Sequence, residues 1–200
     1  MRDVFHFDPL TVAVGDAASL PDAIGVGDRP FHVEVGFGKD VRILRAAADA
    51  PDEWFLGIEI SRKKAESFQR KVARTGLRNV RAYLGDMRKV LAEMIPARAV
   101  DSFTVLFPDP WPKRRHWKNR WIQPETARRL VTALKPGGRL VVATDHDGYR
   151  DHIRTCLLGA GLELVYESDT IPVADTTLFA QRFERLGETV TYLRWRKAAA

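Results

Sequence analysis

From residue 31 onward, the chain alternates short apolar runs with segments of helical periodicity, and this alternation limits the fold more than any other feature. Strand-like apolar runs cover 32–35, 54–60, 79–84, 100–107, 139–143, 162–166 and 189–196, and helical patterns cover 41–47, 61–76, 125–134 and 149–158. Strands that alternate with helices favour an α/β fold, because parallel neighbours need a crossover between them. The sequence therefore predicts a mostly parallel, seven-stranded sheet with helices on both faces and a loop between the last two strands.

The 200 residues suit one domain, which we place at 31–200, preceded by an N-terminal extension over 1–30. Residues 1–30 have Pro and Gly punctuation and weak periodicity, so we expect them to pack on the domain or to become ordered on binding. The N-terminus lacks the apolar stretch of a secretory signal, and no apolar run reaches the ~20 residues of a membrane span. The single cysteine, Cys156, fits a reducing compartment. These features predict a cytoplasmic protein without a membrane partner.

Four acidic residues lie at or just after the ends of four successive predicted strands: Glu34, Glu59, Asp86 and Asp109. An acid at one strand end is often only a helix cap or a turn former. The carboxyl ends of parallel strands, however, share one edge of the sheet, and ligands bind beyond that edge. We therefore expect the four carboxylates to surround a common crevice.

The turn after the first strand contains Gly36 and Gly38, which let the backbone approach a ligand closely. A dinucleotide fingerprint would need a third glycine where the chain has Val41, which argues against a docked pyrophosphate. Glu59 follows about 20 residues later and suits ribose hydroxyls, and Asp86 suits an exocyclic adenine amine. Sites for ribose and adenine without one for phosphate indicate a nucleoside cofactor. S-adenosylmethionine fits, because carboxylates attract its cationic sulfonium.

Residues 108–121 combine a carboxylate with prolines, cations and tryptophans. The prolines restrict the backbone on both sides of Asp109 and hold it in a defined pose. Net charge is +6, and the stretch 113–120 alone supplies five cations and no acid. Cations bind phosphate and aromatic faces stack on bases, so the loop is expected to bind nucleic acid beside a reactive acid. A solvated charged loop is the alternative.

Several motifs together carry a family resemblance: 33–38 (Val-Glu-Val-Gly-Phe-Gly), 57–60 (Gly-Ile-Glu-Ile), 107–116 (Phe-Pro-Asp-Pro-Trp-Pro-Lys-Arg-Arg-His), and 143–146 (Ala-Thr-Asp-His) followed by Tyr149. Over roughly residues 30–195 the chain resembles the bacterial tRNA (guanine-N7)-methyltransferases, a branch of the Rossmann-like class I methyltransferases. The resemblance implies methyl transfer from S-adenosylmethionine to N7 of the guanine at position 46 in the tRNA variable loop. It implies tRNA as partner, no metal, and a monomer or homodimer.

The resemblance also implies a role for each matched residue. Asp109 would be catalytic, and the cofactor would contact Glu34, Gly36, Gly38, Glu59, Asp86 and Asp109. The substrate would contact Lys113, Asp145 and Thr177. RNA would contact Arg114, Arg115, His116, Trp117, Lys118, Asn119 and Arg120.

The chain departs from the family pattern at two positions. Ala180 stands where the family has a substrate-contacting glutamate, for which the nearby Glu184 is one substitute to consider. Asp40 stands where a small residue is usual in the cofactor turn. The sequence does not decide whether Asp109 acts as a base or as an orienting group.

Three other classes of protein are alternatives to a tRNA guanine-N7 methyltransferase. A non-catalytic RNA-binding module would gain nothing from carboxylates beside phosphate. A nicotinamide-dependent oxidoreductase is disfavoured by Val41 and by the basic loop. A methyltransferase acting on amino groups would have an Asn/Asp-Pro-Pro-Tyr/Phe motif, whereas this strand ends in Pro-Asp-Pro-Trp.

Overall fold

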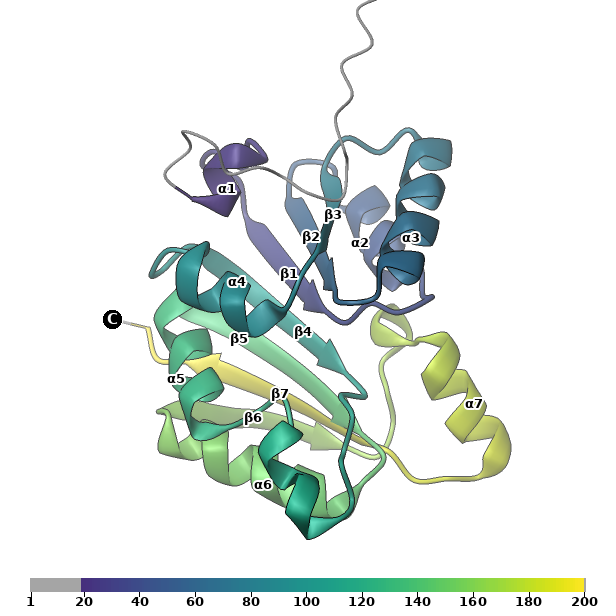
Figure 1. Ribbon diagram of the computed structural model, residues 1–200, viewed down its shortest axis with the longest axis vertical. Helices are drawn as coiled ribbons and strands as arrows, with labels where there is room; N and C mark the ends of the chain where they lie inside the picture. Colours follow the sequence, from purple (N-terminus) through teal and green to yellow (C-terminus); the bar gives the residue numbers. More distant parts are fainter. Residues whose placement is uncertain (1–18, 200) are drawn as a thin grey trace, which may run out of the picture.

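The computed structural model describes residues 19–199, which form one seven-stranded sheet in the order β3-β2-β1-β4-β5-β7-β6 (Figure 1). The strands are β1 (Phe31–Val35), β2 (Trp54–Glu59), β3 (Val80–Leu84), β4 (Val100–Leu106), β5 (Leu134–Thr144), β6 (Leu162–Ser168) and β7 (Thr191–Lys197). Strands β3, β2, β1, β4 and β5 pair in parallel, whereas β7 is antiparallel to both of its neighbours. The predicted α/β fold with seven strands is confirmed, and the sheet is mixed.

Helices cover both faces of this sheet. The helices are α1 (Leu20–Ala23), α2 (Arg42–Asp49), α3 (Arg62–Thr75), α4 (Met87–Glu93), α5 (Pro124–Ala133), α6 (Asp147–Gly159) and α7 (Leu178–Leu186), with short 3-10 turns η1 (Arg114–Asn119) and η2 (Val173–Asp175). Residues of α4, α5 and α6 share the larger hydrophobic core, and residues of α2 and α3 share a smaller one.

Strand β2 shows why the sheet needs cover on both faces, because all six of its residues are buried. Trp54, Leu56 and Ile58 point into the larger core, and Phe55 points into the smaller one. Side chains alternate between faces along a strand, so a strand that is buried at every position must lie between two layers.

The N-terminal segment contributes to the larger core where the structure describes it. Leu20 and Val26 are buried there, and the backbone N–H of Leu20 donates to the carbonyl of Met94 at 2.9 Å. Leu20 and Val26 therefore pack into the core, and the expectation for the whole extension over 1–30 stays a prediction. The rest of the predicted extension, 1–18, lies outside the described residues.

The prediction of a loop between the last two strands is wrong, because α7 lies there. The Thr177 hydroxyl accepts a hydrogen bond from the Ala180 N–H, and Gly187 ends the helix with φ of 66°. Both are ordinary helix boundary signals. Helix α4 was also not expected, since Asp86 was interpreted only as a ligand-binding acid, although it also caps this helix.

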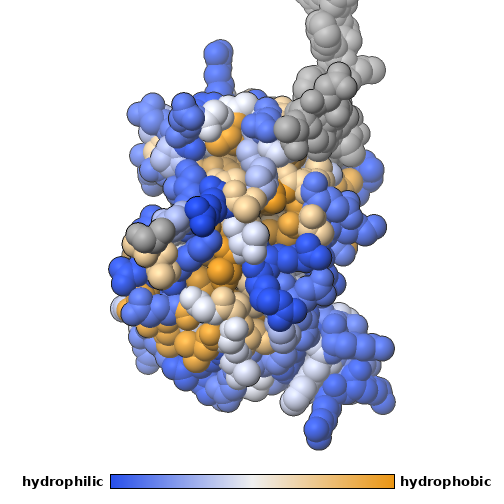
Figure 2. Space-filling view, turned by 90° about the vertical axis from the view of Figure 1, so that its left-hand side faces the viewer, coloured by the Kyte–Doolittle hydropathy of each residue, from blue (hydrophilic) through white to orange (hydrophobic). Residues whose placement is uncertain are grey.

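Viewed from the side that is on the left in Figure 1, hydrophilic residues surround hydrophobic ones that gather toward the middle of the face (Figure 2). Strands β1 and β4 point away from this side and toward α7 (Figure 1). Their carboxyl ends, and the residues that follow them, therefore lie on the side of the molecule near α7.

We predict that Gly57→Ala destabilises the protein. A Cβ atom at position 57 would lie 2.5 Å from Cδ1 of Phe37, whose ring packs against Phe68 at 4.4 Å between centroids. Overpacking of this kind typically costs about 1–3 kcal/mol of folding free energy, to be measured by chemical denaturation.

Gly159→Ala is the matched control. A Cβ atom there would meet no atom within 4 Å, and the residue lies in α6, so stability should stay the same or rise slightly. Equal losses in the two variants would show that the contact with Phe37 is not what requires glycine at position 57.

Candidate active site

Two adjoining cavities lie at the carboxyl ends of the central strands. The first, of about 410 Å³, is lined by Glu59, Asp86 and Asp109 among others, and the second, of about 440 Å³, is lined by Glu34 and Asp109. They share Gly36, Lys64, Leu106, Phe107 and Asp109. The structure thus brings all four strand-end acids to two neighbouring cavities, with Asp109 at their junction.

The turn between β1 and α2 forms the boundary of both cavities. Gly36 and Gly38 have φ of 71° and 61°, in the left-handed region that other residues rarely adopt. The Gly38 N–H donates to Oε2 of Glu59 at 3.0 Å, and the Ser61 N–H donates to its Oε1 at 2.9 Å. Two backbone donors therefore fix the Glu59 carboxylate, and each oxygen keeps a further lone pair for a ligand.

Asp109 lies in a loop whose backbone is strained on both sides. Phe107 and Trp111 have φ of 54° and 44°, a conformation that costs about 1–3 kcal/mol per residue outside glycine. The Phe107 N–H donates to the Ala143 carbonyl at 2.8 Å. The side chain of Asp109 is exposed, and among residues 19–199 none donates a hydrogen bond to it. Such strain is typical of loops that hold a functional group in place.

Helix α7 holds the start of this loop. The Phe107 ring packs against Phe179 and Phe183, with centroids 5.6 Å and 5.3 Å apart. Thr177, Leu178, Phe179 and Arg182 also line the second cavity. The helix that sequence reasoning missed therefore forms a wall of this cavity.

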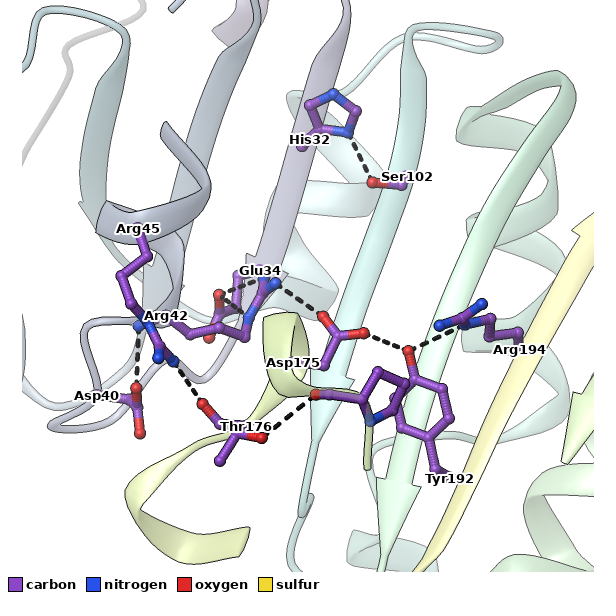
Figure 3. Close-up of polar contacts among 11 residues, drawn as sticks. His32, Glu34, Asp40, Arg42, Arg45, Ser102, Asp175, Thr176, Tyr192 and Arg194 are labelled. Atoms are coloured by element: carbon purple, nitrogen blue, oxygen red, sulfur yellow. Dashed lines mark hydrogen bonds and ion pairs between the residues drawn. The ribbon is translucent and has the colours of Figure 1, made fainter. Parts of the chain in front are cut away.

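Glu34 is not a free carboxylate. It is 4% exposed, and its Oε2 accepts hydrogen bonds from Nη2 and Nε of Arg42 at 2.6 Å and 3.0 Å (Figure 3). Burial raises the pKa of Glu34, and the Arg42 guanidinium opposes that rise. Burial alone would lower the pKa of Arg42, but the attraction of Glu34 and Asp175 outweighs it and raises that pKa. The Arg42 guanidinium therefore keeps its charge between two acidic side chains.

Sequence reasoning did not identify Arg42. The available signal was an arginine within an apolar helical pattern, next to Ile43 and Leu44, which are both buried. A charged residue on the buried side of a helix needs a partner. That partner is Glu34, eight residues earlier on β1.

The basic loop is largely exposed, as expected. Lys113, Arg114, Arg115, Lys118 and Asn119 are exposed, Trp117 is 40% exposed, and His116 is half-buried. The side chain of Asp145 is also exposed, directly after β5. These residues are open to a large ligand.

Arg120 corrects the prediction of an RNA contact, because it is only 1% exposed. Its Nε donates to the Pro110 carbonyl at 2.9 Å, and its Nη1 donates to the Gly148 carbonyl at 3.1 Å. The guanidinium also lies 4.5 Å from the Trp117 ring and 4.9 Å from the Tyr149 ring. Arg120 therefore ties the loop of Asp109 to α6 and presents no charge to RNA.

Residues around Ala180 line two different cavities. Thr177 is 6% exposed and lines the second cavity, while its hydroxyl caps α7. Ala180 and Glu184 line a different cavity of about 210 Å³, beside Asp169 and Glu188. Glu184 therefore does not line the second cavity in place of the missing glutamate.

Two features are absent from the part of the chain that the structure describes. No helix there is both long and apolar enough to span a membrane. Its His, Cys, Asp and Glu side chains form no group of three or more that would hold a metal ion.

Comparisons with known proteins agree with this geometry. A family model described as "Putative methyltransferase" matches residues 28–193. A tRNA (guanine-N(7)-)-methyltransferase of Nocardia farcinica is 33% identical over 199 residues, covering 92% of this chain and 73% of that protein. One of Burkholderia cenocepacia is 36% identical over 206 residues, covering 99% of this chain and 79% of that protein.

Solved structures share the fold at low sequence identity. The 16S rRNA methyltransferase KamB superposes with a TM-score of 0.63 at 18% identity, covering 84% of this chain and 88% of that one. The antibiotic-resistance methyltransferase Kmr superposes with a TM-score of 0.60 at 18% identity, covering 90% of this chain and 92% of that one.

The seven-stranded α/β fold is methyltransferase-like, and the family match places the chain in the methyltransferase class. Within that class, the chain belongs to the tRNA (guanine-N7)-methyltransferase family, which confirms the resemblance seen in the sequence.

We predict that Arg120→Met lowers stability by about 1–3 kcal/mol, because the Pro110 and Gly148 carbonyls would lose a buried donor. Denaturant unfolding measures this loss. The exposed Lys118→Met variant is the control and should change stability by less than about 0.5 kcal/mol.

Binding to tRNA should show the opposite pattern. Lys118→Met should flatten the salt dependence of binding by about one phosphate contact. If Arg120→Met kept full stability and flattened the salt dependence as Lys118→Met does, Arg120 would be an RNA ligand after all.

Proposed function

We propose that this protein transfers the methyl group of S-adenosylmethionine to N7 of a guanine in tRNA, at position 46 of the variable loop. One observation carries the proposal: Asp109 lies where the two cavities meet and four residues before the exposed basic loop begins at Lys113. At that place a cofactor in the crevice and a base presented by RNA would meet. Family membership supports the same substrate.

The first cavity fits the nucleoside part of S-adenosylmethionine. Its volume of about 410 Å³ is in the ordinary range of ligand sites. Glu59 would bind the ribose hydroxyls, since two backbone N–H groups already hold its carboxylate in place. Asp86 has one oxygen occupied by the Arg88 N–H at 2.9 Å and would offer the other to the adenine amine. Glu34 and the glycine turn would lie along the rest of the cofactor.

The reaction itself makes modest demands on the protein. S-adenosylmethionine supplies an electrophilic methyl group on a cationic sulfur. Guanine N7 carries a lone pair and no proton, so no base is needed before the bond forms. The protein must hold the guanine in line with that methyl group, and such positioning can contribute about 7–11 kcal/mol.

Asp109 has the place and the charge to do this. Its carboxylate would accept hydrogen bonds from N1–H and the N2 amine of guanine, which selects guanine over adenine. The ring gains positive charge as N7 is methylated, and a fixed carboxylate stabilises that charge. Asp145, exposed at the end of β5, is the second candidate for this contact.

The exposed cations would hold the RNA. Lys113, Arg114, Arg115 and Lys118 lie in and just before η1, whose last residue, Asn119, lines the first cavity. Their charge would bind phosphates of the variable loop and bring the target base to Asp109.

We predict that Asp109→Ala lowers the single-turnover rate of methyl transfer by about 10²–10³, the usual cost of losing one preorganised electrostatic partner. Wild-type protein should convert unmodified tRNA to a product containing 7-methylguanosine, identified by mass spectrometry. Because Asp109 is exposed and its backbone is held by flanking prolines, the variant should fold normally.

Calorimetry with S-adenosylmethionine is the control for cofactor binding. If Asp109→Ala keeps most of its rate, the role of Asp109 is structural and the guanine contact moves to Asp145. A wild-type product methylated at another atom would contradict the proposed function itself.

A further inference from the structure

A chain of five polar side chains crosses the molecule from β1 to β7: Glu34, Arg42, Asp175, Tyr192 and Arg194 (Figure 3). Arg42 is the member with two acidic partners, because its Nη2 is 2.6 Å from Oε2 of Glu34 and its Nη1 is 3.1 Å from Oδ1 of Asp175. The Tyr192 hydroxyl donates to the other oxygen of Asp175 and accepts a hydrogen bond from Nε of Arg194 at 3.2 Å.

The two acidic partners of Arg42 belong to different parts of the site. Glu34 lines the second cavity from β1, on the side expected to meet the cofactor. Asp175 ends η2, two residues before Thr177 caps α7. Helix α7 supplies the opposite wall of the same cavity through Leu178, Phe179 and Arg182.

The N-terminal end of α7 and the residues just before it are bonded to α2 and to Asp40. Besides the Arg42–Asp175 ion pair, Nη2 of Arg45 donates to the Thr176 carbonyl at 2.5 Å, and Oδ2 of Asp40 accepts from the Leu178 N–H at 2.5 Å. Oδ1 of Asp40 also accepts from the Val41 and Arg42 N–H groups at 2.7 Å and 2.9 Å. Asp40, which departs from the family pattern, therefore links the start of α2 to the start of α7 through backbone N–H groups.

Fold stability does not account for a buried Arg42. Desolvation of a buried ion pair is costly, and a well-packed apolar pair is often as stable or more stable. The neighbours Ile43 and Leu44 show that α2 accepts aliphatic side chains on its buried side. Arg42 is 8% exposed and pairs with carboxylates on two other elements. Its role is therefore better explained by the positions in which it holds Glu34 and Asp175.

We propose that Arg42 is a positioning residue that orients Glu34 toward the cofactor and, through Asp175, fixes the N-terminal end of α7 as a wall of the second cavity on the side of the tRNA substrate. The inference rests on the proposed function for the identity of the substrate. The Arg42 bond to Glu34 would serve the cofactor side of the site, and the Arg42 bond to Asp175 would serve the substrate side. Breaking the Asp175 bond alone should disturb the substrate side and spare the cofactor side.

The test compares Arg42→Met with Asp175→Ala. Arg42→Met should raise both the Kd for S-adenosylmethionine and the KM for tRNA by about tenfold or more, since hydrogen bonds to charged groups are worth that much. Asp175→Ala leaves the Glu34–Arg42 pair in place. It should raise the KM for tRNA by about threefold to tenfold, change the cofactor Kd by less than about twofold, and speed hydrogen exchange in α7.

Two further variants sharpen the comparison. Arg42→Lys keeps the charge but loses the planar fork that reaches both carboxylates, so its effects should fall between wild type and Arg42→Met. Glu184→Ala removes an exposed carboxylate of α7 that lines a different cavity, and it should leave the cofactor Kd, the tRNA KM and α7 exchange unchanged.

The proposal is overturned if Asp175→Ala raises the cofactor Kd as much as the tRNA KM, or if it leaves both the tRNA KM and α7 exchange unchanged. Should Arg42→Met fail to fold, Asp175→Ala and Arg42→Lys still decide. If wild-type protein does not methylate tRNA, the proposed function fails. In that case the cofactor Kd of Arg42→Lys and the α7 exchange of Asp175→Ala still test the positioning role.

Discussion

The parallel pairing of β1 with both β2 and β4 is the constraint on which the rest of the structure depends. In this register Val35 lies beside Ile58 on one side and Val105 on the other, so the three strands end together. The strand order reverses at β1, where the chain moves from β3 on one side to β4 on the other. A crevice opens at such a switch point, and residues that follow the strands necessarily line it.

The sheet does not by itself fix the loop that follows β4. Two sets of contacts with residues distant in the sequence hold this loop in place. On one side, Phe107 packs against Phe179 and Phe183 of α7. On the other side, Arg120 joins the Pro110 carbonyl to the start of α6. Asp109 lies between these two supports, which offset the strain of two non-glycine residues in the left-handed region. Its position is thus set by helices that follow it in the chain.

The sequence predicted most of the sheet, and its errors have a common cause. Strand positions follow from apolar runs, which local composition reveals directly. Helices α4 and α7 were missed because their N-cap residues, Asp86 and Thr177, were interpreted as ligand contacts. Each of these side chains caps its helix and also lines a cavity. One side chain can do both, so the functional interpretation hid the structural one.

By itself the sequence determined the α/β class, the strand-end acids and the family, because these depend on periodicity and on short motifs. Only the tertiary structure decided which charges are available. Lys118 faces solvent while Arg120, two residues away, binds a carbonyl 28 residues along the chain. Arg42 binds Asp175, 133 residues away. Burial and pairing arise from contacts between segments that are distant in sequence, and the free energy of a charge depends on those contacts rather than on its neighbours along the chain.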